Sequence, residues 1–136
     1  MDSVPAMSLE RLQSAPVTLD VPLTTPSLGT YLWRDFMPTP TPTPNQDLLR
    51  IVVTLTETAE TPIPATVSLA YVWVIKDHEV WSSTLDEIRA DFTLQGIASG
   101  GPRWETGSDV DVVVGIKVDK SLRLVRVPKQ TINATF

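Results

Sequence analysis

The residue types that most often carry catalysis or bind metals are scarce in this chain. Its 136 residues include one histidine, His78, and no cysteine. Zinc sites built from histidine and cysteine, and nucleophiles activated by histidine, therefore have only His78 to draw on. His78 lies between Asp77 and Glu79, in a polar stretch typical of a solvated turn. We therefore expect a protein that is not an enzyme, with no catalytic residue, no cofactor and no bound metal.

Carboxylates are the remaining route to catalysis. Asp109 and Asp111 are two residues apart on a predicted strand, so they share a face and could hold a hard cation together with Asp77 or Asp119. A solvated sheet face opposite a row of valines explains the same alternation equally well. The alternative function is therefore a small carboxylate-dependent hydrolase or a glycan-binding domain.

The four tryptophans are many for a chain of this length. Trp73 shares a predicted strand face with Leu69 and is expected in the core. Trp33, Trp81 and Trp104 fall near strand ends or loops, where an amphipathic ring often meets a partner. We interpret these three as candidate partner-binding residues. The leading hypothesis is a non-enzymatic binding module for a protein partner of unknown identity.

The charge of the chain disfavours two classes of partner. The formal net charge is −5, and a negative chain repels both nucleic-acid phosphates and anionic membrane surfaces. No apolar run approaches the roughly 18–20 residues that span a bilayer. The first residues lack the basic start and apolar core of a signal peptide. We therefore expect no nucleic-acid partner, no membrane association and, by default, a cytoplasmic location.

Period-two hydrophobic patterns dominate the elements that must position these residues. Turns are expected at 76–79 and 119–120, each joining two strands into a hairpin. In the stretch 66–76, the residues Val67, Leu69, Tyr71, Trp73 and Ile75 are expected to share one face. Strands are predicted at 17–23, 30–36, 47–57, 66–76, 80–84, 109–118, 121–127 and 129–136.

Three stretches are less well specified. Residues 84–91 could form a short capped helix, or a crossing loop followed by a strand from Phe92. Residues 1–16 are expected to be flexible, with a helix-compatible run at 8–12. Prolines 38, 40, 42 and 44 make 37–46 an extended connector or flap. Their spacing by two gives no P-x-x-P pattern, which argues against a docking peptide.

Seven to nine short strands without βαβ alternation predict a single all-β domain over 1–136. We expect a two-sheet antiparallel sandwich, with a barrel as the alternative. The Trp-x-x-Gly pattern at 104–107, before a long alternating strand and a tight hairpin, resembles immunoglobulin-like sandwiches in general layout. The resemblance implies a fold only, because the Cys–Trp–Cys spacing is missing. Edge strands at 17–23 and 129–136 would allow a homodimer by edge pairing.

Overall fold

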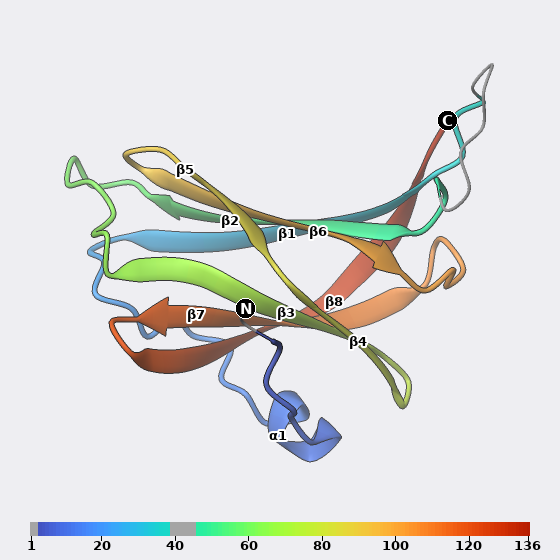
Figure 1. Cartoon of the computed structure of the whole chain (residues 1–136), viewed down its shortest axis with the longest axis horizontal. Helices are drawn as coiled ribbons and strands as arrows, with labels where there is room; N and C mark the ends of the chain where they lie inside the picture. Colours follow the sequence, from blue (N-terminus) through green and yellow to red (C-terminus); the bar gives the residue numbers. More distant parts are fainter. Residues whose placement is uncertain (1–2, 39–45) are drawn as a thin grey trace.

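A computed structural model describes residues 3–38 and 46–136 of the chain. Residues 39–45, most of the predicted proline connector at 37–46, lie outside the described residues. Within the described residues the chain forms one short helix and eight strands (Figure 1). The elements are α1 (Leu9–Gln13), β1 (Pro26–Asp35), β2 (Leu49–Glu57), β3 (Val67–Lys76), β4 (Glu79–Thr84), β5 (Asp86–Arg89), β6 (Thr93–Gly101), β7 (Asp109–Val118) and β8 (Ser121–Thr135).

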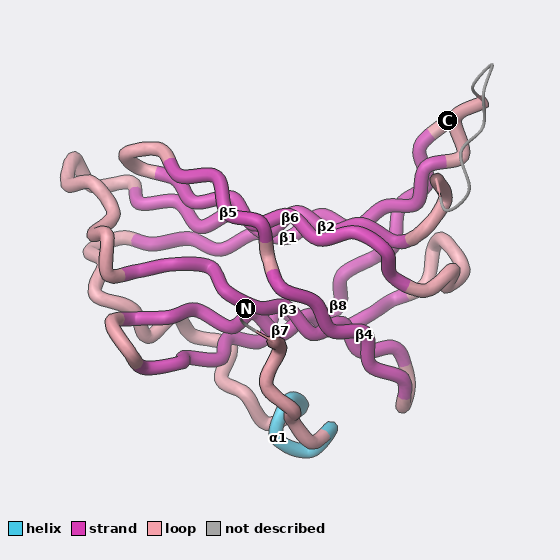
Figure 2. The backbone as a smooth tube through the Cα atoms, viewed as in Figure 1, coloured by secondary structure: helices cyan, strands magenta, loops and turns pink. Residues whose placement is uncertain are grey.

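The eight described strands form one mixed sheet in the order β4-β3-β7-β8-β1-β2-β6-β5. All neighbours are antiparallel except β1 and β8, which run parallel. The outermost strands, β4 and β5, follow one another in the chain, so the sheet curls until it is nearly a barrel (Figure 2). The predicted all-β class is confirmed. The purely antiparallel arrangement is wrong, and the sheet is not clearly a two-sheet sandwich.

The long strand β8 joins two halves of this sheet, one formed by β4, β3 and β7 and the other by β1, β2, β6 and β5. It pairs first with β7 and then, from Ile132 to Thr135, with β1. Between these parts it bends at Pro128, which has no backbone N–H for the ladder, and at Lys129, whose φ is +54°. The Asp111 carboxylate accepts a hydrogen bond of 3.2 Å from the Lys129 backbone N–H and holds this bend. In the strand order β8 lies between β7 and β1, so the prediction of 129–136 as an edge strand is wrong.

The strands β4 and β5 cross from one half of the sheet to the other at Leu85. The Leu85 N–H donates to the carbonyl of Ala70 at 3.0 Å, and its side chain is buried in the main core. Two residues later, in β5, the Glu87 carboxylate accepts a hydrogen bond from the Leu69 N–H at 2.8 Å. These bonds to β3 hold the segment extended, so the helix predicted near 84–91 is wrong. The alternative, a crossing segment followed by a strand, is closer to the structure.

A bulge in β3 divides its apolar residues between two faces. Leu69 pairs with Ile116 and Tyr71 with Gly115, which leaves Ala70 as an extra residue. One extra residue turns every later side chain to the opposite face. Val67 and Leu69 accordingly point into the main core, whereas Tyr71, Trp73 and Ile75 lie in a second cluster on the outer surface. The single face predicted for these five residues is therefore wrong.

Two other strands follow the predicted alternation. The inward residues of β2 and of β7 all belong to the main core. The hairpin turns at 76–79 and 119–120 also form as predicted, with Lys76 opposite Glu79 and Val118 opposite Ser121. The inward residues are Leu49, Ile51, Val53 and Leu55 in β2, and Val110, Val112, Val114, Ile116 and Val118 in β7.

The strand predicted at 17–23 does not form, and these residues follow an irregular path. Leu19, Val21 and Leu23 are partly buried and pack against the main core, while the Pro16 carbonyl accepts from the Arg126 N–H at 2.8 Å.

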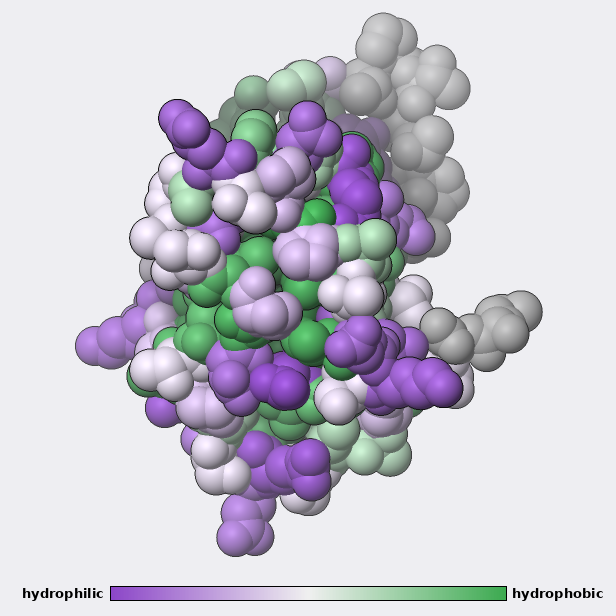
Figure 3. All heavy atoms as spheres, turned by 90° about the vertical axis from the view of Figure 1, so that its left-hand side faces the viewer, coloured by the Kyte–Doolittle hydropathy of each residue, from purple (hydrophilic) through white to green (hydrophobic). Residues whose placement is uncertain are grey.

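Viewed from the left of Figure 1, apolar surface gathers at the centre of the molecule and hydrophilic side chains surround it (Figure 3). The edges of the described sheet are β4 and β5, so an edge-paired homodimer would have to use those strands.

The helix α1 covers the outer side of the sheet half formed by β3, β7 and β8. The Ser8 hydroxyl accepts from the Arg11 N–H at 3.2 Å and caps the helix. Leu12 and Ala15 are buried against Tyr71, Trp73 and Val113 in the second apolar cluster. Figure 1 places α1 on the side of the sheet opposite β1, β2 and β6. Among the described residues, no helix is long and apolar enough to cross a membrane.

Candidate binding face

Trp104 closes one end of the main core and is not free to contact a partner. It follows β6, and 9% of its surface is exposed. Its indole N–H donates to the Glu79 carboxylate at 2.7 Å, and its carbonyl accepts from the Arg34 guanidinium at 3.0 Å. Both contacts tie the loop after β6 to other strands. The structure therefore gives this candidate a packing environment.

Trp81 also points toward the core. It lies in β4, is partly buried and packs against the main apolar cluster. Its ring presses on Gly101, where an added Cβ atom would come within 2.9 Å of the indole. Only glycine leaves room for the ring at that position. The side chain is thus largely engaged in packing, although part of it reaches solvent.

Trp33 has a different environment, because it points outward from β1. Tyr31 points the same way two residues earlier, and the two ring centroids lie 5.6 Å apart at an interplanar angle of 38°. Tyr31 is 50% exposed. Across the neighbouring strands, Tyr31 pairs with Val52, Val52 with Ile97, and Trp33 with Arg50. We define the open face as the outward side chains Tyr31, Trp33, Arg50, Val52, Ile97 and Ser99.

The open face contains a shallow hollow of about 550 Å³. Pockets that bind small molecules commonly measure about 300–1,000 Å³, so the hollow is large enough to hold a group of that size. Trp33, Val52 and Ile97 give the hollow apolar walls, and Leu48 borders it at the start of β2. In Figure 1 no described helix or strand lies over this side of β1, β2 and β6. The hollow can therefore receive a group from another molecule.

Arg50 is the charged residue among those that line the hollow. Its guanidinium makes one hydrogen bond, at 3.3 Å, to the carbonyl of Gln46, and no ion pair with any described residue. A guanidinium has five N–H donors, so most of them remain available. The hollow is consequently apolar with a positive charge at its border, on a chain whose net charge is −5.

An ion pair between buried Arg34 and half-exposed Asp47 fixes the strands next to the open face. Arg34 is 9% exposed and donates to the Asp47 carbonyl at 2.8 Å and to its carboxylate at 3.0 Å. Arg103 also donates to the Asp47 carboxylate, and this hydrogen bond is the main cause of the lowered pKa of Asp47. Gln46 donates to the Met37 carbonyl at 2.8 Å. The end of β1 and the start of β2 are therefore held together on both sides of residues 39–45.

The carboxylates considered for catalysis have structural roles in part. Asp77, Asp109 and Asp111 border one small hollow of about 240 Å³, whereas Asp119 lies elsewhere, in the hairpin turn before β8. Asp109 accepts from the Thr131 hydroxyl at 3.2 Å, and Asp111 holds the bend in β8. No group of three or more His, Cys, Asp or Glu that could hold a metal ion occurs among the described residues. His78 is exposed in its turn.

The most perturbed carboxyl group is one that the sequence did not indicate. Glu57 ends β2, is 3% exposed, and accepts hydrogen bonds from the backbone N–H groups of Thr24, Thr25 and Ala59 and from the Thr25 hydroxyl. Burial raises the pKa of Glu57, but these hydrogen bonds outweigh it and lower the pKa from 4.5 to about 2. A general acid needs a raised pKa, so Glu57 serves as a clamp for the start of β1.

Sequence reasoning named Trp33 but missed Tyr31. The available signal was the spacing of two between these aromatic residues in the strand predicted at 30–36, since residues two apart share a strand face. The structure does not bring Trp33, Trp81 and Trp104 together on one surface. In comparisons with known proteins, no protein-family model, no curated protein and no solved structure matches this chain.

Proposed function

We propose that this chain is a non-enzymatic binding module that recognises a protein partner through its open face. The observation that carries the proposal is the outward pair of Tyr31 and Trp33 on an uncovered sheet face, with Arg50 opposite Trp33. Tryptophan, tyrosine and arginine dominate the binding energy of protein interfaces. All three occur here within one cross-strand neighbourhood.

The partner should present an apolar side chain next to a carboxylate. The apolar walls of the hollow favour the first, and the unpaired guanidinium of Arg50 favours the second. A sugar fits less well, because among the residues that line the hollow only Trp33, Arg50 and Ser99 offer polar side-chain atoms. Sugars need several hydrogen bonds around the stacked ring, so a polypeptide is the better match.

The chain itself supports a polypeptide occupant. Tyr71 and Trp73 form a second outward pair with the same spacing, and the N-terminal segment covers it with Leu12 and Ala15. A short amphipathic segment is therefore sufficient to bury such a pair. An equivalent segment from another protein would bury the open face in the same way.

Selection from a random peptide library displayed on phage tests this proposal. We expect the enriched peptides to carry Asp or Glu beside an apolar residue. Trp33→Ala and Arg50→Glu should each weaken the binding of these peptides by about tenfold or more, in line with truncation of interface anchors. Val80→Ala is the matched control, because Val80 is an exposed apolar residue of β4 away from the open face.

Peptides without an acidic preference, or binding that survives both open-face substitutions, would contradict the proposal. Sedimentation velocity adds a second arm. A dimer of the wild-type chain that disappears in Arg50→Glu would assign the open face to a second copy in place of a different protein. Circular dichroism of each variant checks that the sheet is retained.

A further inference from the structure

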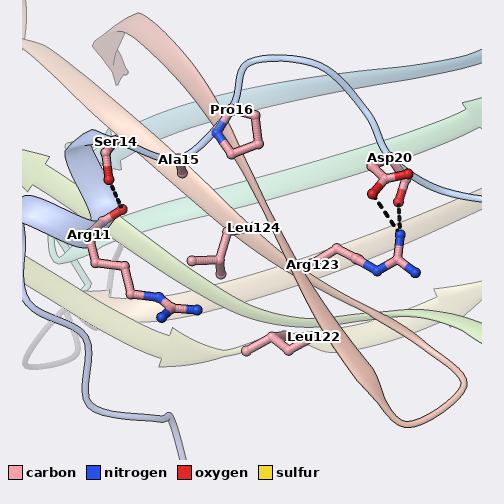
Figure 4. A pocket seen from close by; sticks show the side chains of 8 residues that line it. All are labelled: Arg11, Ser14, Ala15, Pro16, Asp20, Leu122, Arg123 and Leu124. Atoms are coloured by element: carbon pink, nitrogen blue, oxygen red, sulfur yellow. Dashed lines mark hydrogen bonds and ion pairs between the residues drawn. The ribbon is translucent and has the colours of Figure 1, made fainter.

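A second hollow, of about 310 Å³, lies on the opposite side of the molecule from the open face. Its walls are the end of α1 with the residues that follow, and its floor is the start of β8 (Figure 4). The volume falls at the lower end of the range of about 300–1,000 Å³ for small-molecule sites. The hollow is therefore large enough for a small ligand.

The floor of the hollow is apolar and its walls are held in place. Leu122 and Leu124 are half-buried and pack against the cluster around Trp73. On the wall, Ala15 is buried in the same cluster. The next residue, Pro16, is tied to β8 by the hydrogen bond from the Arg126 N–H to its carbonyl. The shape of the hollow thus depends on packed residues and does not require a ligand to form.

Two arginines flank this apolar floor. Figure 4 shows the side chains of Leu122 and Leu124 between those of Arg11 and Arg123. Arg123 donates to the Asp20 carbonyl at 3.0 Å and pairs with its carboxylate at 2.8 Å. The guanidinium of Arg11 has no hydrogen bond or ion pair with any described residue. The lining carries two positive charges and one negative charge, on a chain whose net charge is −5.

We propose that this hollow binds a small amphipathic carboxylate, with its carboxylate on Arg11 and its hydrocarbon part on Leu122 and Leu124. A guanidinium matches a carboxylate geometrically and can bind both of its oxygens. The leucine floor favours a ligand with a hydrocarbon part over a small inorganic anion, which would leave those side chains in water. This site shares no residue with the open face, so it stands or falls independently of the proposed protein partner.

Titration of the ¹⁵N-labelled chain with octanoate, followed by NMR, tests the proposal. We expect saturable shifts of the amides of residues 11–20 and 122–124, with a dissociation constant of about 1 mM or tighter. Affinity should rise from butyrate to hexanoate to octanoate, by about threefold to fourfold for each added CH₂ group. Octanol, which has the chain without the charge, should bind about twofold to fivefold more weakly than octanoate.

Arg11→Gln should weaken octanoate binding by about twofold to fivefold, as expected for an exposed charge pair. Lys120→Gln is the matched control, because it removes the same charge from an exposed residue of the turn before β8 that does not line the hollow. Equal affinity in the two variants would overturn the proposal, as would saturable shifts that map elsewhere or no saturable shifts. Arg11 is exposed and without a partner among the described residues, so Arg11→Gln should fold. A peptide ending in leucine with a free carboxylate, and the same peptide amidated, distinguish a chain terminus from a free acid as the source of the carboxylate.

Discussion

The two halves of the sheet carry the same outward motif, a tyrosine and a tryptophan two residues apart, in opposite situations. Tyr71 and Trp73 are 6% and 2% exposed beneath α1 and its neighbours, whereas Tyr31 is 50% exposed beside a half-buried Trp33. The ring centroids are 6.0 Å apart in the first pair and 5.6 Å in the second. The residue types and the geometry are similar, so what differs is the segment that covers one pair. The exposure of an aromatic pair on a sheet therefore depends on its neighbours in space.

The covered pair also depends on two irregular features of the chain. Without the bulge at Ala70, Tyr71 and Trp73 would point into the main core together with Leu69. Without the capped helix at Leu9–Gln13, they would face solvent. The open pair needs neither feature, because simple alternation along β1 places Leu32 inside and Trp33 outside. Tyr31 and Trp33, which regular alternation leaves uncovered, are therefore a stronger candidate for contact with another molecule than Tyr71 and Trp73.

The largest expected difference between the two pairs is in the effect of truncating each tryptophan on the free energy of unfolding. We expect Trp73→Ala to lower the free energy of unfolding by about 3–5 kcal/mol, because it removes a fully buried ring and leaves a cavity. Trp33→Ala should cost about 1 kcal/mol or less, since its ring is already partly in water. Urea denaturation followed by far-UV circular dichroism measures both values.

Tyrosine replaced by alanine in each pair provides the control for this experiment. Tyr71→Ala should be the more destabilising of the two, and Tyr31→Ala should resemble Trp33→Ala. If Trp33→Ala cost as much stability as Trp73→Ala, the open pair would be part of the structural core. The case for a binding role at the open face would then be lost.

Much of the regular part of the fold could be predicted from the sequence. The alternation in β2 and β7 identified their inward faces, because ten residues of period two leave a single way to place Val110, Val112, Val114 and Val118 of β7 inside together. The two-residue hairpin turns followed from polar residues between apolar runs. One kind of missed feature is a single residue that breaks the period, such as the bulge at Ala70. Another is the continuation of β8 through Pro128, where the sequence predicted two separate strands. Each depends on bonds to strands distant in sequence.

The same reason limits what the sequence showed of the site. Trp33 was identified from its residue type, but by the same criterion Trp81 and Trp104 looked equally exposed. The residues that cover them are distant in sequence: Gly101 contacts Trp81, and Glu79 accepts a hydrogen bond from Trp104. The segment 17–23 alternates like a strand, yet it pairs with no strand among the described residues. Alternation describes the two sides of a segment. It does not identify the element that lies on either side.

Glycine substitutions test the comparison on a smaller scale. A Cβ atom added at Gly115 would lie 3.0 Å from the Trp73 ring and 3.2 Å from Leu122, beneath the covered pair. The same atom at Gly29, two residues before Tyr31 on the open side of β1, would meet nothing within 4 Å. We expect Gly115→Ala to cost about 1 kcal/mol through overpacking. Gly29→Ala should be neutral or stabilising by about 0.5 kcal/mol, because alanine restricts the unfolded chain.

Thermal unfolding of the two variants beside the wild-type protein is sufficient for this test. Both changes add one methyl group to a strand, so intrinsic strand propensity contributes equally to each. A loss of stability at Gly29 equal to that at Gly115 would mean that the open side is covered in solution. Such a result would point to self-association, which sedimentation of the same sample would reveal.

The smallest expected difference between the two halves of the sheet is in how acid affects their stability. The Glu57 clamp holds Thr24 and Thr25 at the start of β1, on the half that bears the open face. Its folded pKa of about 2 lies below the ordinary 4.5, so its contribution to stability is complete above pH 4.5 and is lost as the pH falls toward 2. We expect the amides of β1 to lose protection from hydrogen exchange over this pH range before those of β7. In Glu57→Gln the clamp is weakened at every pH, so β1 should be less protected at neutral pH and less sensitive to acid.

Asp86→Asn, an exposed change in β5, is the control for this experiment. Parallel loss of protection in β1 and β7 would show that the two halves open as one unit, and the open face would then be as rigid as the covered one.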